Sequence, residues 1–360
     1  MSTHADSHGA RDADASIRLT DSDAAIARLS AVQKGYIHDP YITHFVPRAH
    51  LQHPRPPLIN VGTFVRGTAI DDLVDQWLVT VGRLGRQCQI VSMGAGSDTR
   101  FWRVATGTHK DALATYVEID FPEITTKKAM AIRKSKELNG VLGTSPSDIR
   151  VNHGGTAIHA PKYHLLPADL RLPPATTLGN LLATSDGAGG SAILSPSLPT
   201  LLLFECVLVY MEPSSSDDVL RWFVEYFSPQ ETPLGALVYE MFGLGDSFGK
   251  VMVNNLKSRN VSLPGAEPYP TLETLPRRFL NTGFNGARAL TLREIRRSCI
   301  SAEELERLST LEMLDEVEEL DLVLEHYAVT WGLLAPAPGV QVSWGGWGLG
   351  GRPLIYEENV

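Results

Sequence analysis

The stretch Gln89-Ile-Val-Ser-Met-Gly-Ala-Gly-Ser-Asp98 decides the fold that the rest of the chain is expected to adopt. Residues 89–93 form an apolar run typical of a strand buried in a parallel sheet, and the chain then breaks at Gly94-Ala95-Gly96. A glycine turn between a strand and a helix exposes backbone N–H groups, so a flat polar ligand can approach without meeting a Cβ atom. This stretch therefore predicts a cofactor-binding turn.

The glycine turn alone does not identify the cofactor. Position 99 is a threonine, so the chain lacks the third glycine of the dinucleotide pattern Gly-x-Gly-x-x-Gly. This absence disfavours a dehydrogenase, and residues elsewhere in the chain must indicate the ligand.

The composition is that of a globular protein. The chain has 360 residues, of which 43% are hydrophobic, enough to bury one large core or two modest ones. The formal net charge of −9 argues against a domain that binds nucleic-acid phosphates, since such domains carry a basic excess. The three cysteines are far apart and lack Cys-x-x-Cys spacing, so we expect neither a disulfide framework nor a metal site.

The sequence carries no pattern typical of export or of a membrane anchor. Residues 1–20 are polar and lack the apolar core of a signal peptide, and no later window reaches the roughly 18 uninterrupted apolar residues of a membrane span. We therefore expect a cytoplasmic protein without a membrane or nucleic-acid partner, and we expect it to be a monomer.

Strand-like and helix-like segments alternate from residue 89 onward. The strand-like segments are short and nearly all apolar, as strands buried on both faces are, and they cover residues 89–93, 114–120, 164–168, 200–206 and 236–241. Helical apolar stripes lie between them over residues 122–136 and 214–227. This alternation predicts a doubly wound α/β fold with a mostly parallel sheet.

We divide the chain into a disordered tail over residues 1–20 and a single domain over residues 21–360. The domain should contain an N-terminal helical lid, a cofactor-binding core, a segment of further helices with the last strands, and a loosely held C-terminal tail, over residues 21–85, 86–241, 242–334 and 335–360. The third segment should include helices over residues 246–259, 271–281 and 301–324 and strands over residues 284–290 and 326–334. Residues 185–199, rich in Ser, Gly and Pro, should be a flexible insertion.

Three of the predicted strands end in carboxylates near the glycine turn. Asp120 ends the second strand, Asp169 follows the third and Glu205 ends the fourth. The carboxyl ends of parallel strands share one sheet edge, where a carboxylate can accept hydrogen bonds from ribose hydroxyls. Glu118 lies on the same face as Asp120, so either could serve, and we favour Asp120. Each acid alone is explained equally well as a solvated loop carboxylate or a helix cap, but together they favour a nucleoside ligand.

Longer motifs resemble those of a known enzyme family. The segments are KGYIHDPYI, INVGTFVRG, VSMGAGSDTRFWR, YVEIDFP, ADL, LLFECVLVYM and DEVEELDLVLEHYAVTWG. Together they resemble the leucine carboxyl methyltransferase family, whose members use S-adenosylmethionine to methylate the C-terminal leucine carboxylate of the protein phosphatase 2A catalytic subunit. The resemblance runs from about residue 26 to residue 356. It implies a class I methyltransferase fold with a seven-stranded sheet, N-terminal helices and an inserted helical segment that shapes a deep pocket for the peptide tail.

The resemblance also assigns residues to the binding of S-adenosylmethionine, namely Lys34, Arg66, Gly94, Asp120, Asp169, Leu170 and Glu205. It implies that Lys34 and Arg66 hold the methionine part, with Arg66 on its carboxylate. Asp120 would bind the ribose, Asp169 and Leu170 the adenine edge, and Glu205 the methionine end.

The implied reaction requires few special residues. A carboxylate with a pKa near ~3.5 is ionised at neutral pH and is its own nucleophile, so no general base is expected. Tyr210, in the motif VLVYM, is the candidate that positions the substrate carboxylate. Val61 stands where the family often has arginine, so another cation must replace that arginine if it binds the substrate.

Two alternative functions stay open. Related methyltransferases act on a modified tRNA nucleoside, although the acidic charge balance and the absence of a repeat domain count against this substrate. The second alternative is a non-enzymatic scaffold that binds the phosphatase and has lost the cofactor. The intact glycine turn and the strand-end acids argue against it.

Overall fold

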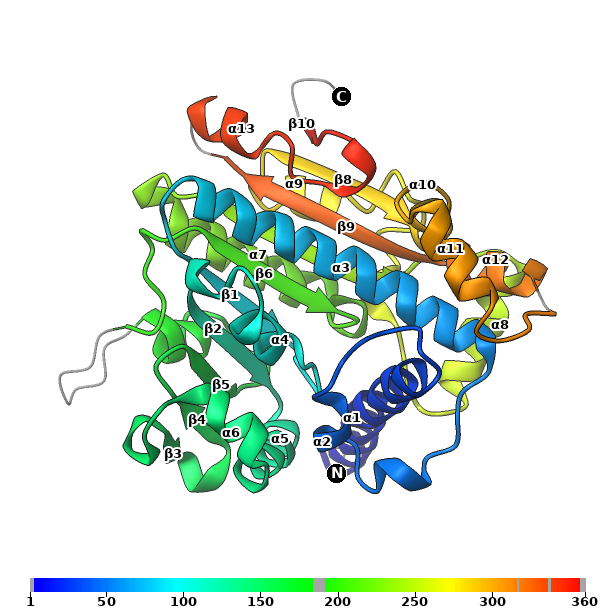
Figure 1. The fold of residues 1–360 in the computed structure, drawn as a ribbon, viewed down its shortest axis with the longest axis horizontal. Helices are drawn as coiled ribbons and strands as arrows, with labels where there is room; N and C mark the ends of the chain where they lie inside the picture. The colour runs from blue at the N-terminus through cyan, green and yellow to red at the C-terminus, as the bar shows by residue number, and fades with distance from the viewer. Residues whose placement is uncertain (1–2, 184–191, 316, 336–337, 357–360) are drawn as a thin grey trace.

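The computed structural model describes residues 3–183, 192–315, 317–335 and 338–356, which form one large sheet with helices on both of its faces (Figure 1). The insertion expected over residues 185–199 lies in part outside these ranges. The helices are α1 Thr3–Gln33, α2 Ile42–Phe45, α3 Pro57–Arg83, α4 Arg100–Thr106, α5 Pro122–Lys134, α6 Lys136–Leu142, α7 Pro213–Phe227, α8 Ser247–Lys257, α9 Arg277–Leu280, α10 Leu292–Ser298, α11 Ala302–Ser309, α12 Val317–Glu325 and α13 Pro338–Trp344.

The sheet of the described residues has ten strands in the order β10-β8-β9-β7-β6-β1-β2-β5-β4-β3. The strands are β1 Cys88–Met93, β2 Leu113–Asp120, β3 Arg150–Asn152, β4 Ala157–His159, β5 Tyr163–Pro167, β6 Thr200–Glu205, β7 Leu234–Met241, β8 Gly286–Thr291, β9 Tyr327–Leu334 and β10 Ile355–Tyr356. In the centre, β5, β2, β1, β6 and β7 are parallel, and β9 runs antiparallel between β7 and β8. These strands are the seven expected from the sequence, and β3, β4 and β10 extend the sheet at its edges.

The apolar run over residues 89–93 lies in β1, in the middle of this sheet. β1 pairs with β2 on one side and with β6 on the other, and every one of its residues is buried. A strand with neighbours on both sides and helices on both faces has no solvated position, which explains why its sequence does not alternate between apolar and polar residues.

Successive residues of β6 face two different cores. Leu201 and Leu203 pack in the core that contains α3, whereas Leu202 packs in the core beneath α7. α3 approaches the sheet closely because Gly235 has no side chain: a Cβ there would lie 2.5 Å from Cζ3 of Trp77. Figure 1 shows α3 lying along one face of the sheet.

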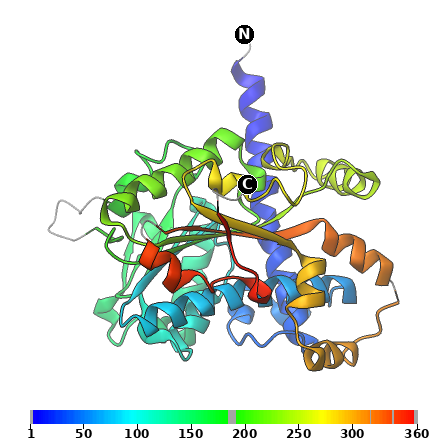
Figure 2. The ribbon, with the colours of Figure 1, turned by 90° about the horizontal axis from the view of Figure 1, so that it is seen from above.

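The first helix begins earlier than the sequence predicts. α1 is helical from Thr3, whereas a disordered tail was expected over residues 1–20. Asp14 of this helix accepts hydrogen bonds of 2.5 and 3.0 Å from Arg171, a residue 157 positions away. This contact is invisible to a local pattern, because the segment is polar and has no apolar stripe. Figure 2 shows the N-terminal end of α1 projecting from the body of the molecule.

Two predicted helices are wrong in their extent. Of residues 271–281 only α9 is helical, because Pro276 lacks an N–H group and disfavours helical geometry in the residue before it. Residues 301–324 contain two helices, α11 and α12, with a break between them. In the break, Glu312 turns inward and accepts a hydrogen bond of 2.8 Å from Asn60, which draws the chain toward α3.

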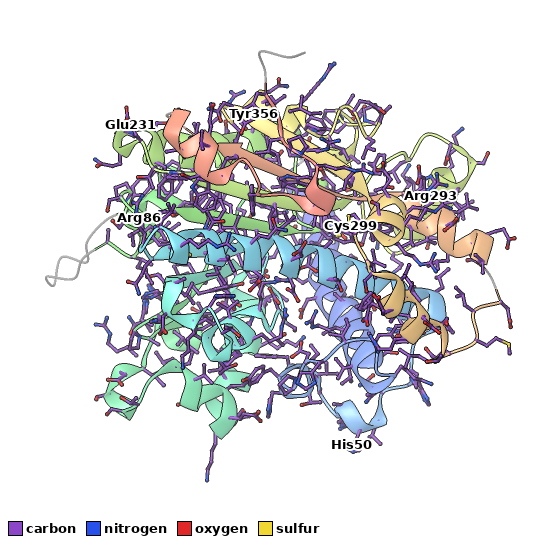
Figure 3. All side chains as sticks on the ribbon, turned by 45° about the horizontal axis from the view of Figure 1, so that its top comes forward. His50, Arg86, Glu231, Arg293, Cys299 and Tyr356 are labelled. Atoms are coloured by element: carbon purple, nitrogen blue, oxygen red, sulfur yellow. The ribbon has the colours of Figure 1, made fainter. Side chains whose placement is uncertain are left out.

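The C-terminal tail was expected to be loosely held, and this expectation is wrong for the described part of it. Trp344 and Trp347 are buried, with ring centroids 3.9 and 5.1 Å from that of Trp77. The indole N–H of Trp347 donates to the carbonyl of Leu73 at 2.9 Å. The chain then forms the short strand β10, and Figure 3 shows its Tyr356 at the margin of the molecule.

Candidate functional site

The carboxyl ends of β1, β2, β5 and β6 open into one cavity of about 380 Å³, and α1 forms its opposite wall. Of the eight residues that the sequence assigned to the site, seven line this cavity: Arg66, Gly94, Asp120, Asp169, Leu170, Glu205 and Tyr210. The eighth, Lys34, is not in its wall.

The turn after β1 requires glycine for two reasons. Gly94 and Gly96 have φ angles of +62° and +48°, in the left-handed region that disfavours a side chain. A Cβ on Gly94 would also lie 2.5 Å from Cγ2 of Val207. The N–H groups of Gly94 and Ala95 donate to the carbonyl of Ile119, at 2.8 and 3.3 Å, so the turn is fastened to β2.

Asp120 ends β2 directly beside the turn. One carboxylate oxygen accepts from the N–H of Gly96 and the other from the N–H of Phe121, both at 2.7 Å. The residue is 9% exposed, and burial raises the pKa of its carboxyl group to about 6. Because Asp120 lines the cavity, a ligand that donates hydroxyl hydrogen bonds to it would stabilise the ionised form.

Glu118, the alternative to Asp120, is not among the described residues that line the cavity. Its Oε2 lies 2.6 Å from both the hydroxyl of Tyr163 and the ammonium of Lys128. Burial raises the pKa of Glu118 to about 7, although Lys128 opposes that shift. The placement of the two acids therefore favours Asp120.

Asp169 and Leu170 follow β5 at one end of the cavity. Arg171 donates to both oxygens of Asp169, at 2.8 and 2.7 Å, and also binds Asp14 of α1. Its guanidinium carbon lies 5.2 Å from the ring centroid of Phe121, which lines the cavity as well. An aromatic ring, an aliphatic side chain and a carboxylate together suit a flat heterocycle that carries an amino group.

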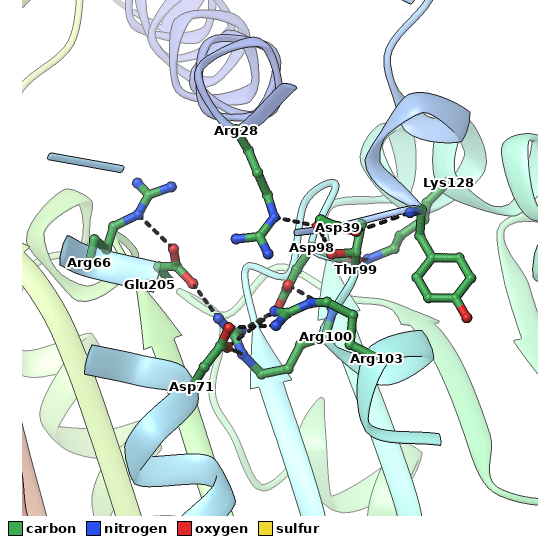
Figure 4. Close-up of polar contacts among 11 residues, drawn as sticks. Arg28, Asp39, Arg66, Asp71, Asp98, Thr99, Arg100, Arg103, Lys128 and Glu205 are labelled. Atoms are coloured by element: carbon green, nitrogen blue, oxygen red, sulfur yellow. Dashed lines mark hydrogen bonds and ion pairs between the residues drawn. The ribbon is translucent and has the colours of Figure 1, made fainter. Parts of the chain in front are cut away.

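The opposite end of the cavity carries a carboxylate between arginines (Figure 4). Nε of Arg66 lies 3.0 Å from Oε1 of Glu205, and Nη2 of Arg100 lies 3.5 Å from Oε2. Arg28 of α1 extends toward the same end; its Nε donates to Asp39 at 2.5 Å, but its Nη2 is buried without a hydrogen-bond partner among the described residues. A buried guanidinium donor without a partner is costly, so it marks a position where a ligand carboxylate would be stabilised.

An ion-pair network beneath the turn orients these groups (Figure 4). Asp71 of α3 accepts hydrogen bonds from Arg103 and, at 2.8 Å, from Arg100, which also binds Asp98 of the turn. Burial alone would raise the pKa of Asp71, but the two guanidinium groups outweigh it and hold that pKa well below its usual range. The network therefore joins α3, α4 and the turn, and it aims Arg100 at Glu205.

Lys34, which was expected to hold the methionine part of the cofactor, lies outside the cavity wall, whereas Arg28 lies in it. The ammonium of Lys34 lies 3.0 Å from Oε1 of Glu312, in the break between α11 and α12. At about 100° per helical residue, a position six residues after Arg28 lies on another face. The sequence does hold a signal for Arg28: it falls at helical spacing within the apolar stripe that contains Ala25 and Leu29, where a charged residue needs a buried partner.

A mostly apolar region of the cavity adjoins Glu205. Its wall includes Tyr210, Met211, Tyr239, Met241, Leu256 and Tyr327. Burial raises the pKa of the Tyr210 phenol well above its usual value, so this side chain is a neutral hydrogen-bond donor near pH 7. Val61 is buried in the core and is not among the described residues of the wall.

The order of the seven central strands, with β9 antiparallel, and the cavity at the carboxyl ends of the parallel strands define a methyltransferase of the class I fold. This confirms the fold class expected from the sequence. In the described ranges no cluster of three His, Cys, Asp or Glu side chains could hold a metal ion, and no helix is both long and apolar enough to cross a membrane.

Comparison with known proteins narrows the class to a family. The profile of the family described as leucine carboxyl methyltransferase matches residues 16–224. Over 354 aligned residues the chain is 44% identical to leucine carboxyl methyltransferase 1 of Cryptococcus neoformans. This alignment covers 90% of this chain and 94% of the relative. The chain is 37% identical to the protein of the same name from Aspergillus fumigatus, over 95% of this chain and 89% of the relative. The chain belongs to the leucine carboxyl methyltransferase family.

Proposed function

We propose that this chain transfers a methyl group from S-adenosylmethionine to the α-carboxylate of the C-terminal leucine of the protein phosphatase 2A catalytic subunit. The observation that supports this best is the order of charged groups along one cavity. It runs from Nη2 of Arg28, which has no hydrogen-bond partner in the described part of the chain, through Glu205 and Asp120 to Asp169. S-adenosylmethionine carries a carboxylate, an ammonium, a ribose and an adenine in the same order. The family supports leucine carboxylate as the acceptor.

The groups that would hold the cofactor come from α1, α3 and the strand ends: Arg28 and Arg66 for its carboxylate, Glu205 for its ammonium, Asp120 for the ribose hydroxyls, and Asp169 with the backbone of Leu170 for the adenine. Bound there, S-adenosylmethionine supplies a methyl group on a positively charged sulfur. Gly94 lines this cavity, and a Cβ there would collide with Val207, so the turn requires glycine.

The protein's contribution to the chemistry is position and the exclusion of water. The acceptor carboxylate is ionised at neutral pH, so the reaction needs no side chain that removes a proton. An oxygen held about 3 Å from the methyl carbon and partly stripped of water reacts far faster than one in solution. The cavity offers both conditions because α1 covers the strand ends.

The region around Tyr210 suits the acceptor. A neutral phenol can orient a carboxylate without neutralising it, whereas a cation tightly paired with the attacking oxygen would reduce its reactivity. The rings of Tyr239 and Tyr327 stack with centroids 5.5 Å apart, and together with Met241 and Leu256 they offer an apolar surface for a leucine side chain.

Radiolabelled methyl transfer to purified phosphatase 2A catalytic subunit, with and without its last residue, tests the proposal. We expect a base-labile methyl ester on the intact protein and none on the shortened one. Equal labelling of both would contradict a leucine carboxylate acceptor. Labelling of tRNA with none of the phosphatase would favour a nucleoside acceptor, and failure to bind S-adenosylmethionine in calorimetry would favour a scaffold without enzymatic activity.

A further inference from the structure

One arginine of the cavity wall has no task in the proposed cofactor site. Among the described residues of the wall, the cationic side chains are all arginines: Arg18, Arg28, Arg66, Arg100, Arg171 and Arg259. A reaction with a carboxylate acceptor needs a group that recognises that carboxylate. The remaining question is which cation is free to take this role.

Five of the six arginines are committed elsewhere. The side chain of Arg100 is 3% exposed and is enclosed by three carboxylates. Arg28 and Arg66 lie at the end proposed for the cofactor carboxylate. Arg18 and Arg171 flank the aromatic ring at the adenine end, at 5.7 and 5.2 Å from its centroid.

The sixth, Arg259, stands beside the apolar region proposed for the acceptor. It follows the end of α8, where its N–H donates to the carbonyl of Leu256 at 2.9 Å, and the side chain of Leu256 lines the same wall. Arg259 and Tyr210 both line this cavity. A cation and a neutral donor thus face the same region.

Arg259 is paired at present with a carboxylate of the protein itself. It donates a hydrogen bond to Oδ2 of Asp23 on α1, and the two side chains are 52% and 47% exposed. Ion pairs as exposed as this one contribute little to stability, so another carboxylate can replace Asp23 at small cost. Asp23 also lies 3.9 Å from Nη2 of Arg55, which is outside the described cavity wall, and its half-exposed carboxylate can be hydrated after the exchange.

We propose that Arg259 binds the C-terminal carboxylate of the protein substrate and releases Asp23 in exchange. This inference rests on the proposed function. A guanidinium group can hold one oxygen of the incoming carboxylate and leave the other near Tyr210, free to attack the methyl group. The exchange swaps one negative charge for another, so it leaves no unpaired charge in the cavity.

The same arrangement explains how product can leave. Methylation converts the carboxylate into a neutral ester, which cannot form an ion pair with Arg259. Asp23 can then return to Arg259, and this return favours release of the ester. Arg259 is therefore a residue that selects a free C-terminus and distinguishes substrate from product.

Steady-state kinetics with purified phosphatase 2A catalytic subunit tests this role. Arg259→Gln should raise KM for the phosphatase about tenfold or more, because one charge-assisted contact to the substrate is lost. The same variant should keep the affinity of the wild-type chain for S-adenosylmethionine, measured by calorimetry, which also verifies that it is folded. Arg259→Lys retains the charge and should recover part of the loss.

Two further variants sharpen the comparison. Arg55→Gln removes the other cation beside Asp23 but lies outside the cavity wall, so KM should stay within twofold of the wild-type value. Asp23→Asn removes the resting competitor and should lower KM for the phosphatase. A rise in KM for Arg55→Gln as large as that for Arg259→Gln would overturn the proposal.

An unchanged KM in Arg259→Gln would also overturn it, and so would an equal loss of S-adenosylmethionine affinity, since that result would assign Arg259 to the cofactor. Should the wild-type chain bind S-adenosylmethionine but methylate no phosphatase, the proposed function fails separately. The Arg259 assignment is then tested with fluorescent peptides ending in a free or an amidated leucine. Equal binding of both peptides to the wild-type chain would refute it.

Discussion

Lowering the pH from 7 to 5 should weaken the binding of S-adenosylmethionine about tenfold, because Asp120 becomes protonated in the ligand-free protein. Burial raises the pKa of this carboxyl group to about 6, so the ionised fraction falls from about 0.9 at pH 7 to about 0.1 at pH 5. Two ribose hydroxyls that both donate to Asp120 require the ionised form. The dissociation constant should rise in proportion, by about 1.4 kcal/mol.

Asp120 should have the opposite effect on the stability of the ligand-free chain. Its pKa is higher in the folded state than its ordinary value of 3.8, so its contribution to stability is fully present below that value and is lost as the pH rises through about 6. The rise of this pKa from 3.8 to about 6 corresponds to a cost of about 3 kcal/mol at neutral pH. Asp120→Asn should therefore raise Tm of the ligand-free protein at pH 7.5 while it weakens cofactor binding.

Calorimetric titration with S-adenosylmethionine at pH 7, 6 and 5 tests this reasoning. Glu118 must be controlled for, because burial raises its pKa to about 7 and it titrates over the same range. The pH dependence should persist in Glu118→Gln and disappear in Asp120→Asn. Equal dissociation constants at pH 7 and pH 5 in the wild-type chain would refute the reasoning, and a dependence that survives in Asp120→Asn would assign it to Glu118.

Other substitutions test single parts of the site and the core. Arg28→Ala should weaken S-adenosylmethionine binding by about 2–4 kcal/mol, because a buried charge-assisted contact is lost. Lys34→Ala should leave the calorimetric affinity within twofold of the wild-type value. Equal losses in the two variants would contradict the assignment of Arg28 rather than Lys34 to the cofactor. Gly94→Ala should abolish the binding of S-adenosylmethionine and lower Tm, because the backbone at this position has a φ of +62°. An affinity equal to that of the wild-type chain would show that the turn does not receive the cofactor. Trp344→Ala should lower the free energy of unfolding by about 3–5 kcal/mol in a denaturant titration, since the ring is buried against Trp77. A loss under about 1 kcal/mol would show that the C-terminal segment is not part of the core.

The parts of the fold that the sequence predicted correctly are those with a local cause. β1, β2 and β6 are central strands that are buried on both faces, so their sequences are mostly apolar, and this pattern is visible within a few residues. The carboxylates of Asp120 and Glu205 were found for the same reason, since each comes at the end of such a run. The sequence pattern places each acid at the end of its strand, and parallel strands bring their carboxyl ends to the same edge of the sheet.

The parts that were missed depend on contacts between distant segments. Trp344 and Trp347 lie in a glycine-rich stretch that looks like a loose tail, and only their packing on α3 shows that they belong to the core. The segment around Asp14 is helical in the structure although its sequence is polar throughout, and its recorded partner is Arg171, far along the chain. Glu312 interrupts a helical pattern by bonding to α3. In each case tertiary contacts override local preference.

The helix α1, whose first part the sequence placed in a tail, contributes to every region of the cavity. Asp14 binds Arg171 at the adenine end, Arg28 extends to the end with Glu205, and Asp23 pairs with Arg259 beside the acceptor region. At about 1.5 Å per residue, the helix from Asp14 to Arg28 is about 21 Å long, enough to cross the four strand ends, which stand about 5 Å apart. The strand ends alone would form a general nucleotide site, open on one side. The glycine turn and the strand ends explain why the cavity suits the cofactor. The helix α1 closes all three regions, and it therefore provides the enclosure that the carboxylate acceptor requires.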